Sequence, residues 1–291
     1  LSNMVNPNVA LITNVAEAHI ENFRSLKEIA KAKGEIIENI AKNGFLILNR
    51  DDKFFNYFLK KSKNYKNINV ISFGRKKGSN IRLISEKTLN GINFLKIRIF
   101  GEKFNLKSNY SQTYNILSLI AVIYSLKLNL KHILKKLEKV EPSEGRGKIY
   151  SIKRFNINFK LIDESYNANP LSMKNAIQNF SKIKKENFKK YLLLSDMLEL
   201  GKKSGLYHKN LADIINRSNI DKFFIYGNKI METFSSIKNT KKGNMLQSLD
   251  DFDIVFSSIL KNGDHLLIKG SNATGLNILS KNLKKGSRHV I

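Results

Sequence analysis

The stretch that decides the fold is residues 158–170, which read NFKLIDESYNANP. Residues 158–163 form a mostly apolar run with the length of a buried strand, and a helical pattern starts at Pro170 and continues to residue 183. The same alternation recurs downstream, with strand-like runs at residues 191–196, 222–227 and 265–269 and helical stretches at residues 206–217 and 272–283. Strands that alternate with helices predict an α/β fold with a parallel sheet and right-handed crossovers.

The first half of the chain shows a second set of elements. A helix should start at Ser25, because Ser25 and Glu28 have the spacing of a capping box, and Gly44 supplies a plausible end. Strands are expected at residues 9–13, 45–49, 69–73, 81–85 and 92–99, and helices at residues 114–128 and 131–137. Residues 141–147 interrupt the apolar pattern with Pro, Ser, two glycines and charges, so we expect two domains, residues 1–143 and 144–291.

Composition limits the class of protein. A chain of 291 residues is long enough for two domains with separate cores. It contains no cysteine, no basic-then-apolar signal sequence and no apolar run of the roughly 18 residues that a membrane span needs. These features favour a cytoplasmic protein without membrane insertion.

The net charge of +27 raises the question of nucleic-acid binding. Lysines are spread over nearly every segment, so a solvated basic surface is the favoured interpretation. A nucleic-acid-binding protein on an α/β fold is the alternative, and a localised basic face would distinguish it.

Polar residues end three strands of the second half, namely Asp163, Asp196 and Lys269. In an open parallel sheet, ligands bind beyond the carboxyl ends of the strands, so these positions should line a site. Ser271 follows Lys269 and Gly270 at a strand-to-helix turn, where free backbone N–H groups can hold an anionic group.

Two residues of the first half could also carry chemistry. Lys33 shares a face with the apolar positions of the helix that starts at Ser25, and burial there would lower the pKa of its amine. The alternative is a lysine whose stem covers the core while its ammonium reaches water. His19 follows the first strand, and a lone histidine in such a place is more often structural than a ligand.

Several segments together resemble the Mur ligases. They are residues 12–23 (ITNVAEAHIENF), 30–36 (AKAKGEI), 163–170 (DESYNANP), 196–201 (DMLELG) and 269–271 (KGS), in the family's order. The resemblance is specific to the family members that add D-alanyl-D-alanine to UDP-N-acetylmuramoyl-tripeptide. It implies the later part of a central ATPase domain, followed by a Rossmann-like domain that receives the incoming amine.

The resemblance also implies a reaction and roles for residues. ATP phosphorylates the tripeptide carboxylate, the dipeptide amine attacks the acyl phosphate, and Mg²⁺ neutralises the crowded oxygens. Lys33 matches a lysine that becomes carbamylated, and His19 matches a histidine that helps to hold a second Mg²⁺. Arg146 matches an arginine near the nucleotide phosphates, Asn115 a residue near the adenine, and Asp163 one that binds the ribose hydroxyls.

The remaining matches concern the same two sites. Tyr166 and Asn167 would complete the nucleotide-facing turn. Asp196, Lys269 and Ser271 lie in segments that approach the dipeptide and the substrate peptide.

The phosphate-binding sequence G-x-x-x-x-G-K-[ST] occurs nowhere in the chain. We therefore interpret the chain as an incomplete peptidoglycan-precursor ligase that is inactive alone, because phosphoryl transfer depends on such a phosphate cradle. A non-catalytic half-protein that pairs with a separately encoded N-terminal half is a further alternative.

Overall fold

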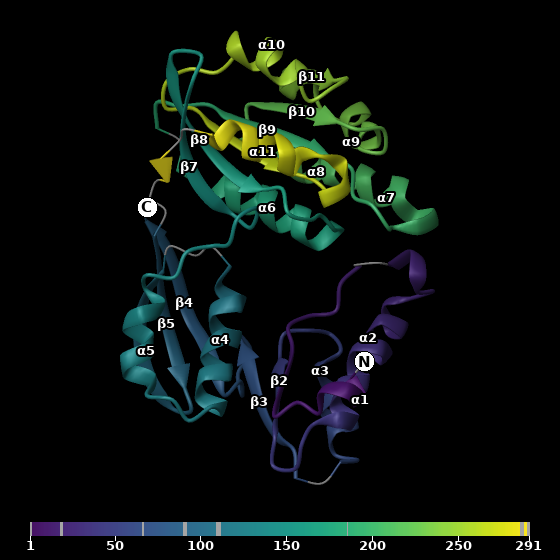
Figure 1. Cartoon of the computed structure of the whole chain (residues 1–291), viewed down its shortest axis with the longest axis vertical. Coiled ribbons are helices and arrows are strands. Elements are labelled where there is room, and N and C mark those ends of the chain that lie inside the picture. Colours follow the sequence, from purple (N-terminus) through teal and green to yellow (C-terminus); the bar gives the residue numbers. More distant parts are fainter. Residues whose placement is uncertain are drawn as a thin grey trace. The chain divides into compact units, whose positions relative to one another are not determined.

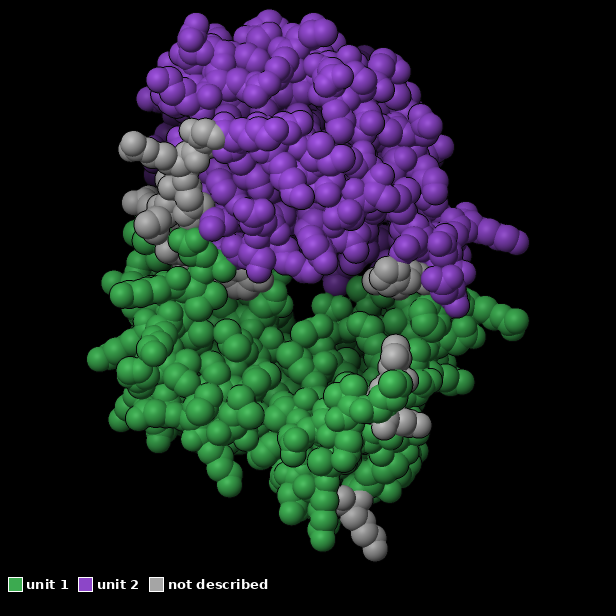
Figure 2. Space-filling view, viewed as in Figure 1, with its two compact units in different colours: residues 1–16, 23–141 green, residues 17–22, 142–291 purple. Residues whose placement is uncertain are grey.

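The computed structural model describes residues 2–17, 20–65, 67–89, 92–108, 112–184, 186–285 and 288–289, with only the backbone at residues 2, 3, 288 and 289. The chain divides into two compact units (Figure 2). Unit 1 comprises residues 1–16 and 23–141, and unit 2 comprises residues 17–22 and 142–291.

Unit 1 is built on one mixed sheet with the strand order β1-β2-β3-β4-β5-β6. Its first four strands are parallel and its last two are antiparallel additions. The strands are β1 (Val9–Ile12), β2 (Phe45–Asn49), β3 (Asn69–Gly74), β4 (Ile81–Leu89), β5 (Ile92–Ile99) and β6 (Glu102–Ser108). The predicted strands are therefore present, whereas β6 was missed because its lysines and asparagine hide the alternation of Phe104 and Leu106.

The helices of unit 1 are α1 (Ser2–Val5), α2 (Leu26–Gly34), α3 (Phe55–Ser62), α4 (Thr113–Ser125) and α5 (Leu130–Leu137). Helices α4 and α5 pack on one face of the sheet, where Leu117 and Leu134 join Leu83, Leu95 and Ile97 in a common core. The side chain of Ser25 caps α2 by accepting a hydrogen bond from the N–H of Glu28, as the sequence predicts. The predicted end at Gly44 is wrong, because α2 ends at Gly34 and a 3₁₀ turn, η2 (Glu35–Asn39), replaces its last turns.

One carboxylate connects the ends of two neighbouring parallel strands in unit 1 through hydrogen bonds. Asp51, just after β2, accepts hydrogen bonds from the N–H groups of Arg75 (2.6 Å) and Lys76 (3.0 Å) beyond β3. It also accepts one from the Tyr114 hydroxyl at 2.8 Å. Gly74 makes room for this contact, since a Cβ there would lie 2.7 Å from Asp51 Oδ2.

Unit 2 is built on a second sheet with the strand order β11-β10-β9-β12-β8-β7-β13. The five strands from β11 to β8 are parallel, which confirms the predicted parallel sheet, and β7 and β13 are antiparallel additions. The strands are β7 (Lys148–Arg154), β8 (Ile157–Glu164), β9 (Lys190–Ser195), β10 (Lys222–Tyr226), β11 (Lys242–Leu246), β12 (His265–Lys269) and β13 (Arg288–His289).

Strand β7 was missed by the sequence analysis. It joins β8 through Phe155 and Asn156, which both have positive φ angles of 53° and 57°. Two such residues make the tight hairpin turn whose twist suits antiparallel strands. The usual sequence signal of such a turn is Asn-Gly or Asp-Gly, and this chain has a phenylalanine at the first turn position instead.

Helices cover both faces of the second sheet (Figure 1). They are α6 (Pro170–Lys182), α7 (Ser204–Lys209), α8 (Leu211–Arg217), α9 (Met231–Ser235), α10 (Asp251–Ser257) and α11 (Leu276–Lys284), with short 3₁₀ turns η1 (Ile20–Asn22), η3 (Gly201–Lys203), η4 (Asn239–Lys241) and η5 (Asn272–Thr274). Strand β9 alternates between the two cores, with Leu192 and Leu194 on the α6 side and Tyr191 and Leu193 on the α11 side. Within the described residues, no helix is long and apolar enough to cross a membrane.

The amino end of this sheet buries a histidine. His265 is 6% exposed, and its ring lies 3.9 Å from the ring of Phe188 between centroids. Burial, reinforced by the charge of Lys160, lowers the pKa of His265 from 6.5 to about 4. The folded state therefore holds a neutral imidazole at neutral pH.

This histidine gives a pH dependence of stability. Below pH 6.5 the unfolded chain takes up a proton at this position, whereas the folded chain does not until about pH 4. Stability should fall by up to about 3 kcal/mol between these values. Urea unfolding of the protein and of His265→Phe measures this loss, and the variant should show a distinctly shallower decline over the same pH range. Equal slopes for the two proteins would contradict the assignment.

Candidate active site

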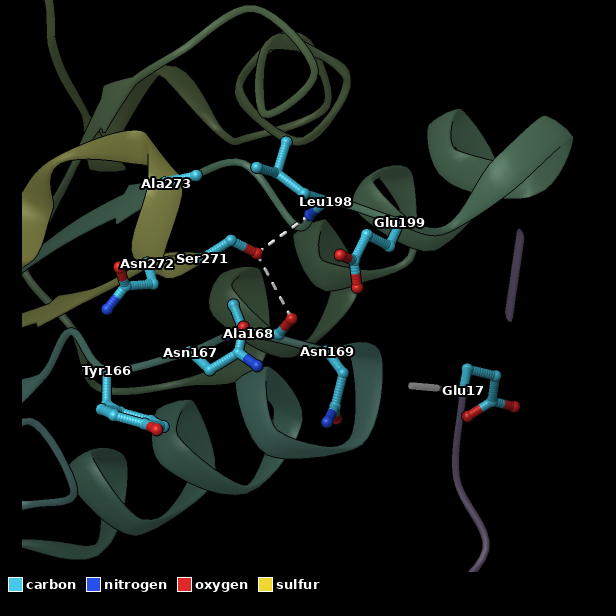
Figure 3. A pocket seen from close by; sticks show the side chains of 10 residues that line it. All are labelled: Glu17, Tyr166, Asn167, Ala168, Asn169, Leu198, Glu199, Ser271, Asn272 and Ala273. Carbon is cyan, nitrogen blue, oxygen red and sulfur yellow. Dashed lines mark hydrogen bonds between the residues drawn. The ribbon is translucent and has the colours of Figure 1, made fainter. Parts of the chain in front are cut away.

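A pocket lies where three neighbouring strands of unit 2 end. Strands β9, β12 and β8 are adjacent in the sheet, and the loops that follow them meet beyond their carboxyl ends (Figure 3). The cavity measures about 410 Å³ and is lined by Glu17, Tyr166, Asn167, Ala168, Asn169, Leu198, Glu199, Ser271, Asn272 and Ala273. The predicted location beyond the strand ends is therefore where the pocket forms.

Helix α6 points its first turn at this pocket. Asn169 caps the helix by accepting a hydrogen bond from the N–H of Ser172 at 2.8 Å, and the Ser172 hydroxyl accepts one from the N–H of Asn169 at 3.0 Å. Pro170 follows in the first helical turn, where its missing N–H costs nothing. The motif of residues 163–170 thus folds into a strand end, a turn and a capped helix start.

Ser271 ties the three loops together. Its N–H donates to the carbonyl of Asp196 at 3.0 Å, and its Oγ accepts a hydrogen bond from the N–H of Leu198 at 2.9 Å. The same hydroxyl lies 3.5 Å from the carbonyl oxygen of Ala168 (Figure 3). One buried serine therefore contacts the loops after β9 and β8 while it belongs to the loop after β12.

Lys269 lies beneath the pocket instead of lining it. It is 2% exposed, and its Nζ donates to the carbonyl of Asn167 at 2.8 Å and lies 3.4 Å from Glu164 Oε2. Burial lowers the pKa of Lys269, and the carboxylate of Glu164 opposes this shift. The ammonium thus braces the turn of residues 164–167 from below.

Asp196 is also a bracing residue and not a lining one. Its Oδ1 accepts a hydrogen bond from the N–H of Ile230 at 2.8 Å. A Cβ at Gly227, whose φ is 126°, would lie 2.7 Å from the same oxygen, so only glycine leaves room for this carboxylate. Asp196 fixes the path of the chain after β9 and β10.

Asp163 is held under the site by a lysine. It is 1% exposed, and it accepts hydrogen bonds from the Ser165 hydroxyl at 2.6 Å and from Lys284 Nζ at 3.0 Å. Burial acts to raise the pKa of Asp163, but these hydrogen bonds prevail and lower it below its ordinary value. The carboxylate is therefore charged and already paired.

Tyr166 and Arg146 form an exposed pair at the rim. The guanidinium of Arg146 lies 4.3 Å from the centre of the Tyr166 ring, and the tyrosine is 50% exposed. Gly145 allows the close approach of the two segments, since a Cβ at its φ of 69° would lie 2.9 Å from the N atom of Tyr166. A planar cation and an aromatic ring are thus presented together.

Of the residues predicted in the first half of the chain, Lys33 lies beside the segment that follows β1. Lys33 Nζ donates to the carbonyl of Asn14 at 3.0 Å, and burial lowers its pKa although the charge of Asp52 acts to raise it. On α2, Lys33 shares a face with the buried Ile29 and Ala30, as predicted, but the helix ends at Gly34, so this face does not continue as far as the sequence suggests. The residue as a whole is exposed, and its amine is partly removed from water. His19 lies outside the described residues.

Asn115 lies in the first turn of α4. Its Nδ2 donates to Gln112 Oε1 at 2.8 Å. Among the residues that the structure describes, no three His, Cys, Asp or Glu side chains gather into a group that could hold a metal ion.

Comparisons with known proteins agree with this architecture. Residues 1–126 match the Mur ligase middle domain, and residues 152–272 match the Mur ligase, glutamate ligase domain. The chain belongs to the Mur ligase family. Its curated relatives include the UDP-N-acetylmuramoyl-tripeptide–D-alanyl-D-alanine ligases of Rickettsia prowazekii, 29% identical over 95% of this chain, and of Buchnera aphidicola subsp. Baizongia pistaciae, 31% identical over 96% of it. The aligned regions cover 61% and 59% of those relatives, so the chain spans about three fifths of their length.

Solved Mur ligases share the fold. MurF from Acinetobacter baumannii superimposes with a TM-score of 0.82 at 24% identity, covering 98% of this chain and 61% of that one. MurF from Thermotoga maritima in complex with ADP gives a TM-score of 0.79 at 23% identity, covering 97% and 64%. At these identities the likeness establishes the arrangement of elements in this Mur ligase chain.

Seven pocket residues were not singled out from the sequence. They are Glu17, Ala168, Asn169, Leu198, Glu199, Asn272 and Ala273. Asn169 and Glu199 do lie within the quoted motifs, and Glu199 has a positive φ of 59° in a turn that aims its side chain at the pocket (Figure 3). Glu17 could not be found, because only the folded chain brings its segment beside the loop after β9, where the N–H of Glu21 donates to the carbonyl of Glu199.

Removing the hydroxyl of Ser271 should loosen the loop after β9. In Ser271→Ala the N–H of Leu198 loses its acceptor, a loss of about 1 kcal/mol, so hydrogen exchange of that amide should quicken roughly fivefold. Exchange measured by NMR tests this, with Ser258→Ala, at an exposed serine of the same unit, as the matched control. Unchanged exchange at Leu198 in the Ser271 variant would show that the hydroxyl does not hold the loop.

Proposed function

We propose that this Mur ligase chain contributes to the ATP-dependent joining of D-alanyl-D-alanine to UDP-N-acetylmuramoyl-tripeptide in the cytoplasm. The observation that carries the proposal is the pocket beyond β8, β9 and β12, which is built from segments 163–170, 196–201 and 269–271. The curated relatives that name this reaction align over nearly the whole chain.

The pocket suits a small zwitterion. Glu17 and Glu199 supply carboxylates for an ammonium group, while Asn167, Asn169 and Asn272 supply amide donors for a carboxylate. The start of α6, with its partial positive charge, lies on the same side as these amides. A dipeptide with one amine, one carboxylate and two methyl groups matches this lining.

The same carboxylates could serve the chemistry. An amine must lose a proton before it attacks an acyl phosphate, and a carboxylate within hydrogen-bond reach can accept that proton. We assign this role to Glu199 or Glu17, the two acidic residues among the lining residues. Ser271 then acts as a positioning residue, because it holds the loop that carries Glu199.

Nucleotide contacts are assigned to the exposed pair at the rim. The Tyr166 ring can stack on a base or ribose, and the Arg146 guanidinium beside it can bind phosphate oxygens. Asn167 would complete this turn, and Asn115, in unit 1, stays a separate predicted nucleotide contact. Asp163 could bind ribose hydroxyls only after exchanging its hydrogen bond with Lys284.

Lys33 fits the expected carbamylation. The reaction needs an uncharged amine, and burial favours that form of Lys33. The product would replace a cation by an anion near Asp52, and two neighbouring anions attract a divalent cation. When bound, Mg²⁺ would neutralise charge on the phosphate oxygens. The described side chains do not by themselves form a metal site, so Mg²⁺ binding by this chain stays a prediction.

Carbamylation can be tested directly. The chain incubated with ¹³C-bicarbonate should give a carbamate signal in the NMR spectrum that grows with pH, as the amine becomes neutral. Lys33→Arg should abolish the signal, whereas Lys31→Arg, at an exposed lysine of the same helix, should keep it. A spectrum without a carbamate signal that depends on Lys33 would contradict the assignment.

The dipeptide assignment predicts a stereospecific binding site. Titration calorimetry of the chain should detect D-alanyl-D-alanine and weaker binding of L-alanyl-L-alanine. Glu199→Gln should weaken D-alanyl-D-alanine roughly tenfold, the equivalent of about 1.4 kcal/mol.

The matched control is Glu186→Gln, which removes an exposed carboxylate from the same unit but away from the pocket lining. Its affinity for the dipeptide should equal that of the unchanged chain. Equal affinity for the two enantiomers, or an equal effect of the two substitutions, would refute the assignment of this pocket.

A further inference from the structure

The antiparallel end of the unit 1 sheet has a solvent-facing side of unusual composition. Helices α4 and α5 cover only the side that carries Leu95 and Ile97, so alternate residues of β4, β5 and β6 face away from that core. Residues that pair on neighbouring strands share a face, so eleven residues lie together on this side of the sheet. In chain order they are Arg82, Ser85, Lys87, Leu89, Ile92, Phe94, Lys96, Arg98, Lys103, Asn105 and Lys107. We call this set the β4–β6 face.

The β4–β6 face is far more basic than the chain as a whole. Six of its eleven residues are Lys or Arg, compared with 51 of 291 in the sequence, and none is Asp or Glu. This share of cations is higher than the composition of the chain alone would give. It is the localised basic face that the sequence could not reveal.

The excess of positive charge destabilises the sheet where cations on neighbouring strands lie opposite each other. Arg98 pairs with Arg82 on one side and with Lys103 on the other, and like charges directly opposite each other on neighbouring strands destabilise a sheet. Arg98 Nε is buried and lacks a hydrogen-bond partner. In the described part of the chain, none of the six cations forms a salt bridge. The four lysines among them are exposed and therefore available to an external anion.

The other end of the face is apolar. Leu89 and Ile92 pair at the end of the β4–β5 hairpin and are 54% and 37% exposed. Phe94 follows in the next row at 37% exposure, with Lys87 and Lys107 on either side. The Lys107 ammonium lies 5.8 Å from the centre of the Phe94 ring.

We propose that the β4–β6 face binds the surface of an anionic lipid bilayer. Cations attract acidic headgroups, while exposed aliphatic and aromatic side chains enter the boundary between headgroups and acyl chains. Single-stranded nucleic acid needs aromatic rings on which bases stack. The face offers a single ring, beside two aliphatic side chains that suit acyl chains instead.

The inference does not depend on the proposed ligase function and can be tested with the whole chain. Sedimentation with vesicles of phosphatidylglycerol and phosphatidylcholine should show binding that weakens as salt is added, and vesicles of phosphatidylcholine alone should not bind. The variant K87Q/K96Q/K107Q should bind roughly 100-fold more weakly, at about fivefold for each cation. Leu89→Ser should weaken binding without changing its salt dependence.

The matched control is K131Q/K135Q/K136Q, which removes the same charge from exposed lysines on α5, the helix that packs on the opposite side of the sheet. This variant should bind anionic vesicles within a few-fold of the unchanged chain. Circular dichroism would show that both triple variants are folded.

Three results would overturn the proposal. The first is that the chain does not bind anionic vesicles. The second is an equal loss of binding in the two triple variants, which would indicate an effect of net charge alone. The third is displacement from vesicles by a single-stranded oligonucleotide that binds more tightly through the same three lysines. The last result would assign the face to nucleic acid.

Discussion

The buried ammonium of Lys269 is the constraint on which the pocket of unit 2 depends. A charge that is 2% exposed is stable only when its donors are used, and here they reach the Asn167 carbonyl and the Glu164 carboxylate. This requirement fixes the turn after β8 relative to the end of β12. Ser271, two residues further on, extends the same linkage to the loop after β9. Pocket shape therefore follows from satisfying one buried cation and one buried hydroxyl.

Residues at the strand ends and residues in the loops that follow have different roles. Residues at the strand ends, such as Asp163 and Lys269, are buried and hold the loops, while residues two to four positions later, such as Ser271 and Asn167, reach the cavity. Asp196 behaves in the same way, because its carboxylate is used by the N–H of Ile230. Polar residues at the strand ends thus mark where the pocket lies without lining it.

The sequence was sufficient for the strands and helices with strong apolar periodicity, and for the location of the pocket. It failed where local signals are weak, as at the Phe155–Asn156 turn and in the lysine-rich β6. It also failed where helix type changed, since the face assigned to Lys33 presumed a single α-helix beyond Gly34. Glu17 reaches the pocket through a contact between distant segments, and the pairing of cations on β4, β5 and β6 depends on strand register. Periodicity encodes neither.

Both units connect the ends of two neighbouring parallel strands in the same way, through an aspartate that packs against a glycine. Asp51 and Asp196 lie one or two residues beyond the ends of their strands. Each carboxylate packs against a glycine, Gly74 or Gly227, at or just after the end of the next strand. In each pair, the aspartate and the glycine constrain each other's identity. A side chain at the glycine would collide with the carboxylate, and a longer acid would collide with the glycine backbone. Across homologues the two positions of each pair should change together or not at all.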